Sequence, residues 1–204
     1  VGPEGCGTLP MAIAYAQYIL CGNVGGENVG ENTACNLKFE HFSHPDLHFV
    51  FPVAGTDTVK SHAVSDNFMV EWRQFLTESP YGSLFDWLKN LGIQNKQGLI
   101  GVDEATEINK KLSLKAYEGG YKVMIIWMAD KMNGPSANKL LKLLEEPPAK
   151  TVFILITEST SDMLQTILSR CQVIDFIGLS ESVIAEALVS RENCEPTVAK
   201  KIAH

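Results

Sequence analysis

Two continuous apolar segments with a helical segment between them constrain the fold of this chain more than any other feature. Residues 122–128 (KVMIIWM) and 151–157 (TVFILIT) have the composition of buried strands, and residues 135–146 repeat alanine and leucine at helical spacing. Continuous apolar strands joined through crossover helices are typical of parallel sheets that are buried on both faces. The pattern therefore predicts an α/β protein with a parallel sheet flanked by helices.

The other segments of the chain fit the same architecture. We expect further helices at residues 10–20, 68–76, 83–91 and 103–114, and short strands at residues 48–53, 99–102 and 172–176. After Gly178 the pattern is helical only, which differs from the alternation before it. We therefore expect an α/β core domain over residues 1–177 and the beginning of a small helical lid domain over residues 178–204.

Composition limits the classes of partner and compartment. The 204 residues carry 17 basic and 24 acidic side chains, for a net charge of −7, whereas a protein that binds nucleic acid over its whole surface is usually basic. No apolar run reaches the ~18 residues that a membrane helix needs, so we expect no membrane contact. The five cysteines are odd in number and widely spaced, which indicates reduced thiols and a cytoplasmic protein.

Residues 2–9 (GPEGCGTL) have the glycine spacing of a phosphate-binding loop. The glycines are Gly2, Gly5 and Gly7. In a working loop of the form G-x-x-x-x-G-K-[ST], backbone N–H groups bind the phosphates, the lysine reaches the β- and γ-phosphates and the hydroxyl holds Mg²⁺. Here Thr8 replaces the lysine and Leu9 replaces the hydroxyl. We expect the loop to keep its shape without its chemistry.

The acidic residue that would hold Mg²⁺ is missing as well. In phosphate-loop NTPases this acid stands at the end of a second buried strand, where the present chain has Trp127 and Met128. Asp130 follows past the expected end of the strand, and we expect it to cap the next turn. Two independent losses argue against ATP hydrolysis more strongly than the loop does alone.

Three further motifs give the chain a family resemblance. Residues 122–148 (KVMIIWMADKMNGPSANKLLKLLEEPP), the strand TVFILIT and the triplet Ser169-Arg170-Cys171 resemble the AAA+ domain of bacterial clamp-loader subunits, and more narrowly the delta-prime family of DNA polymerase III. Members of this family share the fold of the hydrolysing subunits but do not hydrolyse ATP. The resemblance implies that Arg170 reaches the ATP site of a neighbouring subunit, where a guanidinium stabilises charge on the γ-phosphate. The alternative is an ordinary surface salt bridge.

The resemblance also implies a set of partners, and it leaves two other functions open. A subunit of this kind is a scaffold that assembles with other clamp-loader subunits and, through them, meets the sliding clamp and primed DNA. It binds no cofactor itself, because the ATP belongs to the neighbouring subunit. The first alternative is an active ATP-hydrolysing clamp-loader subunit or a related AAA+ ATPase. The second is an interaction module with a vestigial loop.

Two cysteines stand where the family usually carries a small zinc module with four cysteines. Cys21 and Cys35 flank a stretch rich in glycine and asparagine, which we expect to be a loop, and His41 and His44 follow shortly after. A structural zinc site needs four ligands in tetrahedral array, but the C-x₂-C pairs are missing here. Zinc binding through Cys21 and Cys35 stays open, and so does a pair of buried or free thiols.

Two other groups of residues have both a functional and a plain interpretation. Thr157 and Glu158 fall where the family places its γ-phosphate sensor, but a glutamate repels phosphate, and we expect a strand end with no sensing role. The lysines that could face DNA are Lys110, Lys111, Lys115, Lys139 and Lys142. We expect most of these lysines to lie on solvated helix faces.

Overall fold

A parallel sheet lies at the centre of the protein. The computed structural model describes residues 1–22, 33–118 and 120–203. The sheet has the order β1-β2-β3, from β1 (Leu47–Val50), β2 (Lys122–Ile126) and β3 (Thr151–Leu155). In the middle strand, Ile125 lies beside Phe49 on one side and Ile154 on the other, and both pairings are parallel. The predicted α/β class is therefore confirmed.

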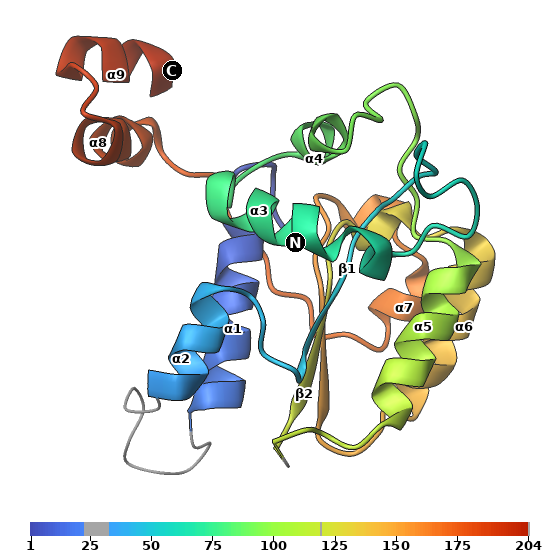
Figure 1. Ribbon diagram of the computed structural model, residues 1–204. Helices are drawn as coiled ribbons and strands as arrows, with labels where there is room; N and C mark the ends of the chain where they lie inside the picture. The colour runs from blue at the N-terminus through green and yellow to red at the C-terminus, as the bar shows by residue number, and fades with distance from the viewer. Residues whose placement is uncertain (23–32, 119, 204) are drawn as a thin grey trace.

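Helices cover both faces of this sheet (Figure 1). One group comprises α1 (Thr8–Cys21), α2 (Thr33–Glu40), α3 (Met69–Glu78) and α4 (Leu84–Asn90), and the other comprises α5 (Val102–Ser113), α6 (Gly134–Glu145) and α7 (Gln165–Leu168). Along β2, Val123 and Ile125 pack with the first group, whereas Met124 and Ile126 pack with α5 and α6. Because successive strand residues point to opposite faces, burial of both faces requires the continuous apolar run.

An aromatic cluster holds the connection between α3 and α4 against the sheet. Trp72 and Trp87 are fully buried. Trp72 stacks on Phe51 with 4.1 Å between ring centroids, and it lies edge-on to Trp87 at 5.0 Å. The Trp87 indole N–H donates to the carbonyl of Pro52 over 2.8 Å, which satisfies its buried donor. The cluster thereby fixes residues 79–83, which border the glycine loop.

Some predicted strands are shorter than expected. The strands expected at 48–53 and 122–128 end at Val50 and Ile126, and residues 99–102 form only isolated bridges. Residues 172–176 form no regular strand, but they lie beside Val1. The Val1 ammonium donates to the carbonyl of Ile174 over 2.8 Å, and the Phe176 N–H donates to the Val1 carbonyl over 2.7 Å. The extended N-terminal residue thus takes the place of a strand partner.

Two helices stand apart from the sheet in Figure 1, joined to it by an extended segment. They are α8 (Glu181–Glu192) and α9 (Pro196–Ala203). Their buried residues Ala185, Ala199 and Ala203 form a small cluster of their own. The predicted helical character after Gly178 is therefore confirmed, while the domain boundary between residues 177 and 178 stays a prediction.

Three short 3-10 helices complete the described secondary structure. They are η1 (Ser65–Phe68), η2 (Ala129–Lys131) and η3 (Thr160–Asp162). The second begins directly after Met128, whose backbone adopts the left-handed conformation with φ of 54°. This conformation is uncommon for a residue other than glycine. It turns the chain sharply after β2 and brings Asp130 toward the end of β3.

Candidate functional site

The glycine loop connects the end of the sheet to the first helix. The Gly2 N–H donates to the carbonyl of Thr157 over 3.2 Å, which places the start of the loop beside the end of β3. Gly5 and Gly7 have φ values of 74° and 91°, a region in which side chains are strained. Gly7 is the residue before the first turn of α1. The loop therefore joins an extended segment to a helix N-terminus, and its glycines are required by the backbone.

The pocket beside this loop is small. It is lined by loop residues together with Tyr81, Trp127 and Glu158, and its volume is about 30 Å³. That volume holds a water molecule or two, whereas pockets for small molecules measure about 300–1,000 Å³. A β-carbon added to Gly7 would lie 3.3 Å from Cε1 of Tyr81, so the edge of the tyrosine ring lies against the loop.

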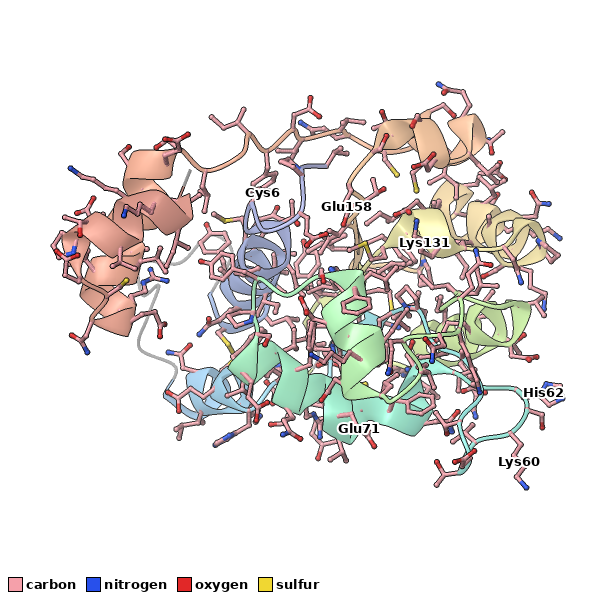
Figure 2. The ribbon with its side chains drawn as sticks, turned by 90° about the horizontal axis from the view of Figure 1, so that it is seen from above. Cys6, Lys60, His62, Glu71, Lys131 and Glu158 are labelled. Atoms are coloured by element: carbon pink, nitrogen blue, oxygen red, sulfur yellow. A yellow bond between two sulfur atoms is a disulfide. The ribbon has the colours of Figure 1, made fainter. Side chains whose placement is uncertain are left out.

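The pocket also carries negative charge. Glu4 and Glu158 both line it. Burial raises the pKa of the Glu158 carboxyl above its usual range, and repulsion from Glu4 and Asp130 raises it further, while Lys131 lowers it. In Figure 2, Glu158 lies between the loop, marked by Cys6, and Lys131. An anionic phosphate placed here would meet carboxylates without the loop lysine that normally balances its charge.

Trp127 and Met128 belong to the hydrophobic core. They are 3% and 5% exposed, and the Trp127 ring lies 5.2 Å from Trp72 and 5.9 Å from Phe75, measured between centroids. The two positions therefore provide packing and no carboxylate.

Asp130 is held inside the protein. Its side chain is 5% exposed and pairs with Lys131 at 2.7 Å, and Oδ1 accepts a hydrogen bond from Thr157 Oγ1 over 2.9 Å. The expectation that Asp130 caps the next turn is wrong, because η2 is preceded by Met128 and has no side-chain cap. Asp130 instead joins the ends of β2 and β3.

Arg170 follows α7 and lies partly exposed at the surface. Nη1 donates to the Thr166 carbonyl over 2.8 Å and to Ser169 Oγ over 3.3 Å. Nη2 donates to Glu145 Oε1 over 2.5 Å, in a pair whose arginine and glutamate side chains are 34% and 47% exposed. The salt bridge that the sequence left as an alternative is thus present within the chain.

The two neighbours of Arg170 have structural roles. Ser169 ends α7, and its hydroxyl donates to the Thr166 carbonyl over 3.1 Å. Cys171 packs against the cluster that includes α5 and α6. Burial raises the pKa of the Cys171 thiol, which disfavours the reactive thiolate form. In this triplet the arginine side chain is therefore partly exposed to solvent, and the cysteine side chain holds the segment against the core.

Cys21 and Cys35 are joined by a disulfide, with 5.5 Å between their α-carbons. Residues 23–32 of the predicted loop lie outside the described residues. The bond corrects the expectation of reduced thiols, and sulfurs paired in this way are not the thiolates that zinc binds. Among the described residues, no three His, Cys, Asp or Glu side chains gather as metal ligands. The residues that the structure describes therefore do not fit the zinc module of the family.

His44 is used in packing rather than as a metal ligand. Its side chain is buried, and Nδ1 accepts a hydrogen bond from the Asp46 backbone N–H over 3.2 Å. Nε2 lies 3.3 Å from Glu118 Oε2. Burial lowers the pKa of the His44 imidazole, although the neighbouring Glu118 and Asp46 oppose this shift. The contact with Asp46 spans the turn that precedes β1.

Several of the lysines considered for DNA contact have local partners. Lys110 pairs with Glu107 at 3.4 Å, and Lys111 pairs with Asp66 at 2.5 Å. Lys139 donates to Thr106 Oγ1 over 3.1 Å, which joins α6 to α5. These contacts agree with the expectation of ordinary helix surfaces.

The sequence reasoning missed Glu145 and Tyr81. Glu145 is part of the LLEEPP run, so its motif was visible, but the contact with Arg170 spans 25 residues. Tyr81 has no motif around it and reaches the loop only because the aromatic cluster holds residues 79–83.

No helix in the described part of the chain has the length and apolar character needed to cross a bilayer.

The fold and the site together define a parallel α/β protein in which a glycine loop without its lysine leads into the first helix. A family model described as "DNA polymerase III, delta subunit" matches residues 1–180. The chain belongs to this family.

Individual relatives agree with the family match. "DNA polymerase III subunit delta'" of Haemophilus influenzae is 30% identical over 192 residues, covering 94% of this chain and 46% of that protein. The protein of the same name from Bacillus subtilis is 28% identical over 203 residues, covering 100% and 48%. "DNA polymerase III subunit tau" of Bacillus subtilis is 39% identical over 93 residues, covering 46% and 16%. The chain thus spans about half the length of the curated delta' relatives.

Proposed function

We propose that this chain is a non-hydrolysing subunit of the DNA polymerase III clamp loader and that Arg170 acts in trans on the ATP site of a neighbouring subunit. The proposal rests on the contrast between the chain's own loop pocket and its exposed arginine. The chain's own loop pocket measures about 30 Å³ and is bordered by Glu4 and Glu158, whereas the Arg170 guanidinium is partly exposed. The small acidic pocket disfavours a phosphate bound by the chain itself, whereas the exposed arginine is a cation that a neighbour can use.

The chemistry of arginine supports this role. A guanidinium is always charged and carries five N–H donors that match phosphate oxygens. Three of these donors are engaged by Thr166, Ser169 and Glu145, so Nε–H and one Nη2–H have no partner among the described residues. Arginines supplied in trans accelerate phosphoryl transfer by about 10³–10⁵-fold in GTPases.

The proposed partners follow from the names of the relatives, which are subunits of DNA polymerase III. The chain assembles with hydrolysing clamp-loader subunits in the cytoplasm. Through that assembly it contributes to placing a sliding clamp on primed DNA, and it requires no bound nucleotide of its own. With a net charge of −7, its contribution to DNA contact is local or comes from the assembly as a whole.

Reconstitution with the hydrolysing subunits tests the proposal. We expect Arg170→Ala to lower DNA- and clamp-stimulated ATP turnover at least tenfold while the subunits still co-elute in size-exclusion chromatography. The matched control is Arg191→Ala, which removes an exposed arginine from α8 and should leave turnover unchanged. Unchanged turnover in Arg170→Ala contradicts the role in trans.

The second candidate is an ATP-hydrolysing clamp-loader subunit, and the partial match to subunit tau is the observation that favours it. It requires tight binding of Mg²⁺-ATP by this chain alone. Titration of the isolated chain with fluorescent ATP, with and without Mg²⁺, separates the two candidates, because only the second predicts Mg²⁺-dependent binding. If the chain neither binds ATP nor assembles with the hydrolysing subunits, an interaction module with a vestigial loop becomes the better interpretation.

A further inference from the structure

The guanidinium of Arg170 is held by two separate elements. Its own helix α7 provides the Thr166 carbonyl at 2.8 Å and Ser169 Oγ at 3.3 Å, both bound to Nη1. The last residue of α6, Glu145, provides the carboxylate at 2.5 Å from Nη2. Contacts on two nitrogens from two directions fix the plane of the group, which a single ion pair does not.

The supports of this arrangement share one core. Leu143 and Leu144 of α6 pack against the same hydrophobic cluster as Leu168 and Cys171, which flank Arg170 in the chain. The carboxylate and the arginine are therefore carried by elements whose spacing is set by burial rather than by the ion pair. An ion pair this exposed contributes little to the stability of the fold.

The position of Glu145 is costly for α6 considered alone. Glu145 and the following Glu146 end this helix, where the helix dipole is negative and acidic side chains are unfavourable. A cation beside Glu145 offsets that cost. Glu146 is exposed and its carboxylate does not reach Arg170, so of the two adjacent glutamates only Glu145 holds the guanidinium.

We infer that Glu145 is a positioning residue for Arg170: it orients the guanidinium so that the remaining Nε–H and Nη2–H face away from the chain, toward a phosphate group on another molecule. The inference rests on the proposed role of Arg170 in trans. Glu145 does not touch that phosphate itself. It acts by restricting a long side chain before the partner arrives, which lowers the entropy lost on contact.

The test compares substitutions at the two glutamates in the reconstituted loader. Glu145→Ala should lower the maximal ATP turnover by about 2- to 10-fold, the effect expected when one long side chain is no longer held in place. KM for ATP should stay unchanged. Glu145→Gln should retain turnover within about twofold, because the amide oxygen still accepts from Nη2. Glu146→Ala is the matched control and should match the unmodified protein.

A double variant separates positioning from a structural effect. Adding Glu145→Ala to Arg170→Ala should cause no further loss of turnover, because Glu145 acts only through the arginine. Full turnover in Glu145→Ala, or a gain, overturns the inference while leaving the role of Arg170 intact if Arg170→Ala is impaired. The inference is also overturned if Glu145→Ala lowers ATP turnover by the same factor in the Arg170→Ala variant as in the unmodified protein. Full turnover in Arg170→Ala instead overturns the proposed function.

Discussion

Thr157 Oγ1 donates a hydrogen bond to Asp130 Oδ1 over 2.9 Å, and this contact joins the ends of two neighbouring strands beneath the glycine loop. The same hydroxyl accepts the Ser159 N–H over 3.3 Å. Thr157 lies where the family resemblance places a γ-phosphate sensor, whereas Asp130 lies past the acid positions, which Trp127 and Met128 occupy. Here the two side chains are hydrogen-bonded to each other, so the polar atoms at this end of the sheet support the fold.

Replacement of Thr157 by valine should therefore destabilise the protein. The change keeps the shape of the side chain but removes one donor from Asp130, whose side chain is only 5% exposed. A buried carboxylate that loses a hydrogen bond costs about 1–3 kcal/mol. Urea unfolding monitored by tryptophan fluorescence measures the change. Ser161→Ala, at an exposed hydroxyl nearby, should shift the midpoint little, and equal shifts in both variants would contradict the assignment.

Restoring the missing lysine should not restore nucleotide binding. Thr8→Lys supplies the cation, but the pocket of about 30 Å³ remains bordered by Glu4, Glu158 and the ring of Tyr81. We expect isothermal titration of this variant with Mg²⁺-ATP to give no heat of binding up to millimolar ligand. Adding Glu158→Gln should not change the result, because space as well as charge is lacking. Micromolar affinity in either variant would show that the pocket is not too small and too acidic for phosphate.

The sheet and the glycine loop could be predicted because local rules determine them. The strand at Lys122–Ile126 is buried on both faces, so its sequence is continuously apolar. The loop needs positive φ at Gly5 and Gly7, and only glycine adopts this conformation without strain. In each segment a single local requirement, burial for the strand and positive φ for the loop, determines the types of residue that the sequence contains.

The contacts around the candidate site could not be predicted in the same way. The pairing of Arg170 with Glu145 and the position of Tyr81 over the loop depend on how helices pack on the sheet. Judged only by their neighbours in the chain, Arg170, Glu145 and Tyr81 could equally well lie on an exposed surface without these contacts. The bond between Cys21 and Cys35 depends on the close approach of α1 and α2, and cysteine spacing alone does not determine it.

Counting thiols tests that bond. Three cysteines are free in the structure, namely Cys6, Cys171 and Cys194. In denaturant without reductant we expect three thiols to react with Ellman's reagent, and five after reduction. Cys21→Ser should raise the unreduced count to four and lower the free energy of unfolding by about 3 kcal/mol, because the cross-link closes a loop of 14 residues. Cys194→Ser should lower the count to two. Five reactive thiols together with bound zinc would favour the zinc module instead.

The buried carboxyl of Glu104 makes stability depend on pH. Its side chain is 1% exposed, Oε2 accepts the Ser65 N–H over 2.6 Å and Oε1 has no partner among the described residues. Burial raises the pKa of Glu104 from 4.5 to about 7, against the opposing effects of Ser65 and Lys111. Between these two values the unfolded chain releases the proton first, so the free energy of unfolding falls as pH rises.

Glu104→Gln should remove this dependence, because glutamine resembles the protonated acid and does not titrate. At pH 8 the variant should be more stable than the unmodified chain by up to about 3 kcal/mol, which corresponds to the pKa difference of 4.5 against about 7. At pH 4.5 the two should differ little. Urea unfolding at both pH values measures the difference, with Glu107→Gln at a partly exposed position of α5 as the control. If Glu104→Gln is instead less stable than the unmodified chain at pH 8, the sign of the effect is reversed and the raised pKa is contradicted.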